Sequence, residues 1–336
     1  MIKKLISYML TAVLIIFLLS ACGSSSNNNN NNTGAGTSDK ISVVSTIFPQ
    51  YDWVTQILGD HADTVDLTLL VNSGIDLHSF QPSVSDIAQI SDCDMFIYVG
   101  GQSDEWVKDA LNNAGNENMV VIDLLDIIGD LAKEEEIIEG MEDDHDHDNE
   151  ADEHDHGADF DEHIWLSLKN VQILCDHIAK ELAKLDPQNA EEYLSNNETY
   201  KERLAELDLK YENMVNEAKY DTVLFADRFP FRYLVDDYGL SYFAAFPGCS
   251  AETEASFETI VFLANKVDEL DLNHVMVIEG SDQSIAKTII ENTSRHDRDI
   301  LVLDSLQSIT SSDITTGVNY LSIMEDNYDV LMKALN

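Results

Sequence analysis

"DPQNAEEYLSNNETYKERLAELDLKYENMVNEAKY" (residues 186–220) has the pattern of one long amphipathic helix. Asp186 can cap the helix start, and Pro187 suits the first helical turn. Apolar residues then recur at helical spacing. They are Tyr200, Leu204, Leu207, Tyr211 and Met214. At about 1.5 Å per residue such a helix is roughly 45 Å long, enough to join two lobes as a stiff connection.

Short apolar or β-branched runs flank this helix on both sides. Those before it are followed by segments with helical patterning, which is typical of buried parallel strands in βα units. The runs are 41–47, 64–71, 95–100 and 120–125 before the helix, and 222–226, 240–246, 274–280 and 300–306 after it. We therefore predict an α/β fold with two doubly wound lobes, 41–185 and 221–336, joined by the helix 186–220.

The N-terminus has the features of a bacterial lipoprotein signal. Lys3 and Lys4 precede an apolar run, 5–19, and "LSAC" (19–22) resembles a lipobox. We expect a signal peptide over 1–21, a lipid on Cys22 and a flexible polar tether over 22–40. This places the protein outside the cytoplasm, anchored to the cell membrane, at a Gram-positive cell surface or a periplasmic face.

Composition limits the function classes. The chain has 336 residues, 44% of them hydrophobic, and a formal net charge of −44. That charge disfavours nucleic acid as a partner and suits a protein that handles cations. Cys93, Cys175 and Cys249 show no CxxC spacing, so we interpret them as buried apolar thiols rather than a disulfide framework.

The segment "EDDHDHDNEADEHDHGADFDEHIW" (142–165) is dense in Asp, Glu and His. Imidazole suits zinc, copper or nickel, and carboxylates attract any divalent cation. Ordering a mobile loop costs entropy, so we expect the loop 142–162 to bind several ions weakly. The histidines concerned are His145, His147, His154 and His156. The alternative is a solvated acidic loop with incidental histidines.

Two further histidines are candidates for a fixed site. His163 stands where the acidic loop turns apolar, so packing would hold it in place. His78 follows the second predicted strand, and ligands of doubly wound sheets bind beyond the carboxyl ends of strands. The alternatives are a structural role for His163 and a plain surface position for His78.

The second lobe offers carboxylates at its strand ends. Asp227 comes directly after the predicted strand 222–226, and Glu279 and Asp282 come after the third strand of that lobe. They could complete a site with the histidines. The alternative for each is capping of the following helix, a common role of Asp.

Several segments together resemble the metal-binding solute-binding lipoproteins of ABC transporters, the zinc- and manganese-uptake type. They occur in the expected order and span nearly all of 41–334. They are "VVSTIFPQYDWVTQILGD", "SGIDLHSFQPSVSDI", "DEHIWLSLKN", "VMVIEGSDQSIAKTI" and "TTGVNYLSIMEDNYDVLMKAL". The resemblance implies two lobes bridged by a rigid helix, with the metal in the inter-lobe cleft. It places His78 and His163 at the first two ligand positions and Asp282 at the acidic one, with Glu279 as an alternative.

One segment departs from the family pattern. Where the family usually has a further His or Glu ligand, this chain has "FADRFPFRYLVDDYGL" (225–240). Ala226 or Arg228 aligns there and neither binds a metal, so Asp227 is the nearest substitute. Two imidazoles with two carboxylates would favour Mn²⁺, whereas the His-rich loop is typical of zinc-type members. Glu252 and Glu254 are outside candidates.

These observations predict a binding protein without catalytic activity. We expect it to capture Zn²⁺ as a monomer and to deliver the ion to the permease of an ABC transporter. The alternatives are a manganese-specific protein of the same type, and a surface adhesin or metal buffer. A metalloenzyme is disfavoured because the chain has no HExxH motif.

Overall fold

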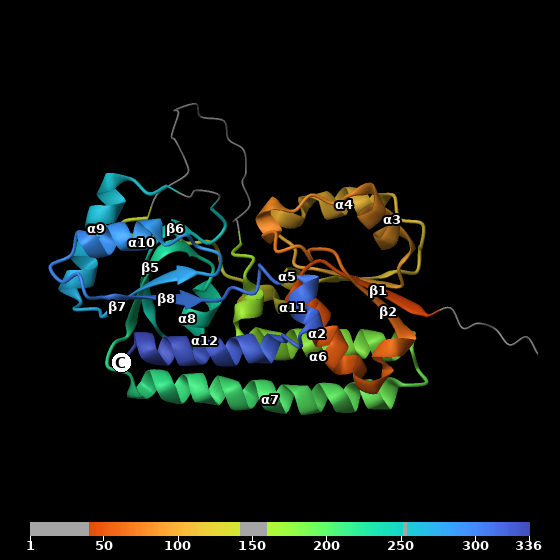
Figure 1. Cartoon of the computed structure of the whole chain (residues 1–336). Helices are drawn as coiled ribbons and strands as arrows, with labels where there is room; N and C mark the ends of the chain where they lie inside the picture. Colours follow the sequence, from red (N-terminus) through yellow and green to blue (C-terminus); the bar gives the residue numbers. More distant parts are fainter. Residues whose placement is uncertain (1–39, 142–159, 251–253) are drawn as a thin grey trace, which may run out of the picture. The chain divides into compact units, whose positions relative to one another are not determined.

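The computed structural model describes residues 40–141, 160–250 and 254–336 (Figure 1). The described elements all belong to one compact unit, Lys40–Asn336. No helix in these three ranges is long and apolar enough to cross a membrane. The predicted signal peptide, the lipid site at Cys22, nearly all of the tether and the histidines of the acidic loop lie outside the described residues.

The first lobe is built on a four-stranded parallel sheet of order β2-β1-β3-β4. Its strands are β1 (Ile41–Ser45), β2 (Val65–Leu69), β3 (Met95–Tyr98) and β4 (Val120–Asp123). In Figure 1, α3 and α4 cover one face of this sheet and α2 and α6 the other. These helices are α2 (Phe48–Leu58), α3 (Val84–Asp92), α4 (Glu105–Asn112) and α6 (Leu168–Leu185). The short helix α5 (Leu124–Ile128) follows β4 directly.

The second lobe repeats the same topology with the order β6-β5-β7-β8. Its strands are β5 (Thr222–Phe229), β6 (Ser241–Pro247), β7 (His274–Ile278) and β8 (Asp299–Leu303). Its helices are α8 (Arg232–Tyr238), α9 (Phe257–Glu269), α10 (Ser284–Glu291) and α11 (Ser311–Thr315). Both sheets are buried on two faces, which explains the near-continuous apolar runs. The predicted two-lobed α/β fold is confirmed.

Strand β5 differs from its prediction. It continues to Phe229, with a shift of register against β6 between Phe225 and Arg228. The sequence analysis expected Asp227 directly after this strand. In the structure, Asp227 lies within the strand. This irregularity changes the directions of the side chains near the carboxyl end of β5.

The long helix is α7, Ala190–Glu217, about 42 Å in length. It begins later than predicted because residues 187–189 form a turn, and Asp186 instead accepts hydrogen bonds from Asn189 and Tyr193. The whole predicted apolar stripe is buried. α7 packs on α2 and α6 from the first lobe and on α8 and α12 (Tyr320–Ala334) from the second, so it joins the two lobes along its length (Figure 1). The domain boundaries given above stay predictions.

Buried side chains also tie the two lobes together. Trp165 is fully buried and donates its Nε1–H to the carbonyl of Ser305 at 2.9 Å. The hydroxyl of Tyr320 donates to the carbonyl of Trp165 at 2.7 Å. On the first lobe, the carboxylate of Asp52 in α2 accepts from the backbone N–H of Tyr320 at 3.1 Å. The first turn of α12 is thus anchored to the first lobe.

Asp52 makes the stability of the fold depend on pH. Burial raises the pKa of its carboxyl to about 6, from an ordinary value of 3.8. Between about pH 4 and pH 6 the unfolded chain has lost this proton while the folded chain keeps it, so stability falls as pH rises through that window. We expect Asp52→Asn to remove this fall, which amounts to roughly 3 kcal/mol at most.

Urea unfolding of metal-free protein at pH 4 and pH 7 measures the effect. The loss of unfolding free energy between these two pH values should be smaller in the variant than in the unmodified chain. Equal losses in the two proteins would contradict the role assigned to Asp52.

Candidate metal centre

His163 is held in a fully buried position just ahead of α6. Its backbone N–H and its Nδ1 both lie within hydrogen-bonding distance of Asp161 Oδ1, at 2.8 and 2.9 Å. Because an ionised carboxylate only accepts, Nδ1 carries a proton and donates it. The ring of Trp165 packs 5.2 Å away, centroid to centroid. These contacts fix the ring and leave Nε2 for another partner.

His78 is held in a similar way from the other side. It lies in a 3-10 turn, Leu77–Ser79, that follows β2, and its backbone N–H donates to Asp76 Oδ1 at 2.9 Å. Its Nδ1 is 2.7 Å from the hydroxyl of Ser103 and 3.4 Å from Glu162 Oε2. The Glu162 oxygen is buried and has no hydrogen-bond partner in the described part of the chain. Because these contacts occupy Nδ1 of His78, its Nε2 is the nitrogen left for a ligand.

The two free nitrogens face each other. His78 Nε2 lies 3.2 Å from His163 Nε2. Two imidazoles bound to one tetrahedral zinc ion at about 2.0–2.1 Å place their nitrogens about 3.3 Å apart. The pair is thus already spaced for one metal ion, with the opposite nitrogen of each ring oriented by a hydrogen-bond partner, as metal-binding histidines usually are.

The electrostatic surroundings suit a cation. Burial, together with neighbouring His163, lowers the pKa of His78 to about 3, so this imidazole stays neutral. Burial acts the same way on His163, but Asp161 and Glu162 outweigh it and raise the pKa of that ring. The carboxylates beside His163 therefore favour positive charge at this site, which a bound metal ion can supply.

The structure does not gather the predicted carboxylates of the second lobe around this pair. Asp282 is exposed and accepts at 2.7 Å from the backbone N–H of Ser284, the first residue of α10. Glu279 accepts from the backbone N–H and the hydroxyl of Ser305, at 2.8 and 2.6 Å. Burial, with a contribution from nearby Asp304, raises the pKa of Glu279 to about 7. Their roles as ligands stay predictions.

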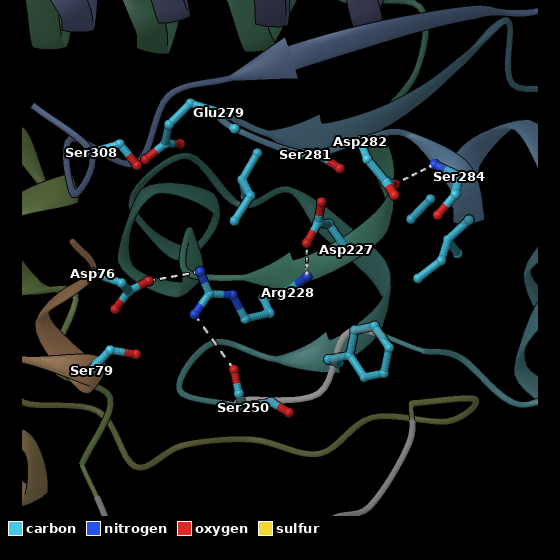
Figure 2. Close-up of a pocket in the computed structure, with 15 residues that line it drawn as sticks. Asp76, Ser79, Asp227, Arg228, Ser250, Glu279, Ser281, Asp282, Ser284 and Ser308 are labelled. Atoms are coloured by element: carbon cyan, nitrogen blue, oxygen red, sulfur yellow. Dashed lines mark hydrogen bonds and ion pairs between the residues drawn. The ribbon is translucent and has the colours of Figure 1, made fainter. Parts of the chain in front are cut away.

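Asp227 and Arg228 line a pocket between the two lobes (Figure 2). The side chain of Asp227 accepts from the backbone N–H of Arg228 at 2.9 Å. The guanidinium of Arg228 extends to Asp76 and forms an ion pair of 2.7 Å between the lobes. Asp76 thus links the turn that carries His78 to the second lobe, and the Asp227 carboxylate is engaged in a local contact.

This pocket has a volume of about 490 Å³ and lies beside the turn that carries His78, although neither imidazole of the pair lines it. Side chains from both lobes line it, among them Asp76, Ser79, Asp227, Arg228, Glu279 and Asp282. The pocket gives solvent and ions access to the cleft, and its acidic lining attracts cations.

The sequence analysis interpreted Cys249 as a buried apolar thiol and missed its place beside the two histidines; Cys93 and Cys175 are buried, whereas Cys249 is only half-buried. Its Sγ and the nitrogens of His78 and His163 all lie within 4.8 Å of one another, and no other His, Cys, Asp or Glu joins them in the described ranges. The preceding Gly248 allows this approach, because a Cβ there would lie 3.1 Å from His163 Cε1 and 2.9 Å from the carbonyl of Phe229. The available signal was its place after β6, the strand-end position that singled out the other candidates.

Three comparisons with known proteins bear on the family to which the chain belongs. The family described as "Zinc-uptake complex component A periplasmic" matches residues 43–334. The zinc-binding lipoprotein AdcA of Streptococcus pneumoniae is 30% identical over 296 residues, covering 87% of this chain and 55% of the relative. The high-affinity zinc uptake system protein ZnuA of Bacillus subtilis is 28% identical, covering 88% of each. The chain spans about half the length of the AdcA relatives it matches.

The solved structures agree with this pattern. The zinc-bound ZnuA-like domain of Streptococcus pneumoniae AdcA matches with a TM-score of 0.68 and 27% identity, over 88% of this chain and 99% of that one. The metal-dependent lipoprotein YcdH of Bacillus subtilis matches with a TM-score of 0.70 and 26% identity, over 88% and 99%. The laminin-binding protein Lmb of Streptococcus agalactiae, at 23% identity, shares the fold.

Proposed function

The chain belongs to the family of periplasmic components A of zinc-uptake complexes, and on that premise we propose that it captures Zn²⁺ outside the cytoplasm for an ABC transporter. The observation that carries the proposal is the pair of imidazole nitrogens, His78 Nε2 and His163 Nε2, facing each other at 3.2 Å. The relatives named as zinc-binding or zinc-uptake proteins support zinc as the cargo.

Capture uses ligands that are already placed. The ion enters through the acidic pocket and takes the lone pairs of the two imidazoles. Asp161 keeps its hydrogen bond to His163 and stabilises the charge that the ring shares with the metal. Metal binding requires both imidazoles to be deprotonated, so affinity should fall at low pH.

Delivery involves partners outside this chain. We propose that a lipid on Cys22 holds the protein at the membrane and that the loop with His145, His147, His154 and His156 collects ions near the cleft. The protein then docks as a monomer on the permease, which receives the ion. The family is one of transport components and not of enzymes, in line with a role without catalysis.

Competitive titration with Zn²⁺ and Mn²⁺ tests the proposal. The mature chain, residues 22–336 with Cys22→Ser, should bind one Zn²⁺ tightly per chain and further ions weakly. Deleting residues 142–159 should leave the tight site and remove the weaker ones. Tight binding of Mn²⁺ with Zn²⁺ confined to weak sites would overturn zinc as the cargo.

Asp161 provides a test of the geometry. Replacing Asp161 by alanine removes the acceptor that orients His163, and we expect zinc affinity to fall about 10- to 100-fold. Titration against a chromophoric chelator measures the dissociation constant. The matched control is Asp130→Ala, which removes an exposed carboxylate of the same lobe and should leave the constant unchanged. An Asp161 variant with unchanged affinity would contradict the orienting role.

A further inference from the structure

Two imidazoles alone do not make a tight zinc site. Protein zinc sites hold the ion with at least three side-chain ligands. In the second lobe, the stretch of β5 that faces the cleft presents Ala226, Asp227 and Arg228. The guanidinium of Arg228 offers only hydrogen-bond donors and is paired with Asp76, and the Asp227 side chain accepts from the backbone N–H of its own neighbour. Among the described residues, no side chain of this stretch belongs to the group of possible ligand atoms around the two imidazoles, which points to another element for the third ligand.

The turn after β6 supplies one. The backbone N–H of Cys249 donates to Glu135 Oε1 at 3.0 Å, which holds this turn against the first lobe. Gly248 lies against the imidazole of His163, and the next residue places its Sγ within 4.8 Å of one ring nitrogen of each histidine. A zinc ion bound to sulfur at about 2.3 Å and to nitrogen at about 2.0–2.1 Å needs a separation of about 3.6 Å. The distance from Sγ to each nitrogen therefore exceeds the separation in a zinc site by roughly 1 Å or less. A small rotation of the Cys249 side chain can remove this difference.

We propose that the Cys249 thiolate is the third protein ligand of the ion captured between His78 and His163. This inference rests on the proposed function and names the donor set of its site. On binding, the thiol S–H bond breaks, an S–Zn bond forms from the sulfur electron pair, and the proton leaves to water. No oxidant or reductant takes part.

The donor set explains the choice of cargo. Thiolate is a soft ligand that favours Zn²⁺ over Mn²⁺, whereas the carboxylates expected from the sequence would favour Mn²⁺. A bound metal ion also deprotonates a coordinating thiol outright. Burial, with Glu135 adding to it, raises the pKa of the Cys249 thiol in the metal-free protein.

Cobalt serves as the spectroscopic probe. Co²⁺ added to the mature chain with Cys22→Ser should give the near-ultraviolet sulfur-to-cobalt charge-transfer band of a thiolate ligand. Cys249→Ser and Cys249→Ala should lack this band while still showing weak visible cobalt bands from the two imidazoles. The matched control is Cys93→Ala, a buried cysteine of the first lobe that lies outside the donor group, and it should keep the band.

Metal competition gives a second readout. The preference for Zn²⁺ over Mn²⁺, as the ratio of dissociation constants, should fall at least about 10-fold in Cys249→Ser and stay unchanged in Cys93→Ala. A chain that binds Co²⁺ and Zn²⁺ without the charge-transfer band, or a band that persists in both Cys249 variants, overturns the thiolate ligand and leaves the proposed function intact. A chain that binds no zinc tightly overturns both.

Discussion

Replacing His163 by alanine is expected to raise the dissociation constant for Zn²⁺ at least about 100-fold. Removing a residue that only orients a metal ligand weakens binding about 10- to 100-fold, and removing the ligand itself should weaken binding more. His163 Nε2 is one of the two nitrogens that face each other in the cleft. The ring is also fixed by Asp161 and packed on Trp165.

Titration of the metal-free variant against a chelator of known affinity measures this effect. His163 is fully buried, so its thermal unfolding must be followed alongside, and His78→Ala provides a second variant at the more exposed ligand. The control is His177→Ala on α6, whose side chain is 43% exposed. A folded His163 variant that binds zinc as tightly as the control would refute the ligand assignment.

Replacing Trp165 by alanine is expected to lower the free energy of unfolding by about 3–5 kcal/mol. The side chain is fully buried, and its Nε1–H satisfies the carbonyl of Ser305 in the second lobe. Truncation therefore leaves a cavity and an unpaired buried carbonyl at the junction of the lobes. The same residue packs on His163, so weaker zinc binding should accompany the loss of stability.

Urea unfolding of metal-free protein measures the change. The control is Phe257→Ala, since Phe257 is 77% exposed and its truncation should alter stability by no more than about 0.5 kcal/mol. A loss below about 1 kcal/mol for Trp165→Ala would contradict the view that this side chain joins the lobes.

The fold could be predicted largely from local pattern. The apolar runs of the buried strands and the stripe of α7 depend on periodicity, which sequence carries directly. The resemblance drawn from the motifs is confirmed by the family match over 43–334. The extent of β5 could not be predicted, because the strand continues through polar Asp227 and Arg228 only by pairing with β6. Such pairing is a tertiary effect that overrides local preference.

The sequence pattern predicted only part of the metal site. His78 and His163 stand out because each follows a recognisable change in the sequence, a strand end or the close of the acidic loop. The hydrogen bonds made by the side chains of Asp227, Glu279 and Asp282 could not be predicted from sequence spacing alone. The nearness of Cys249 depends on the path of the turn after β6 across His163, which only the packed structure reveals.

The most direct test is a crystal structure of the zinc-bound protein with anomalous diffraction recorded at the zinc absorption edge. The account predicts one strong anomalous peak in the cleft, about 2.0–2.1 Å from both His78 Nε2 and His163 Nε2 and about 2.3 Å from Cys249 Sγ. A peak that touches neither imidazole, or no peak in the cleft at full zinc loading, would contradict the assignment of this site as the place where the protein captures its ion.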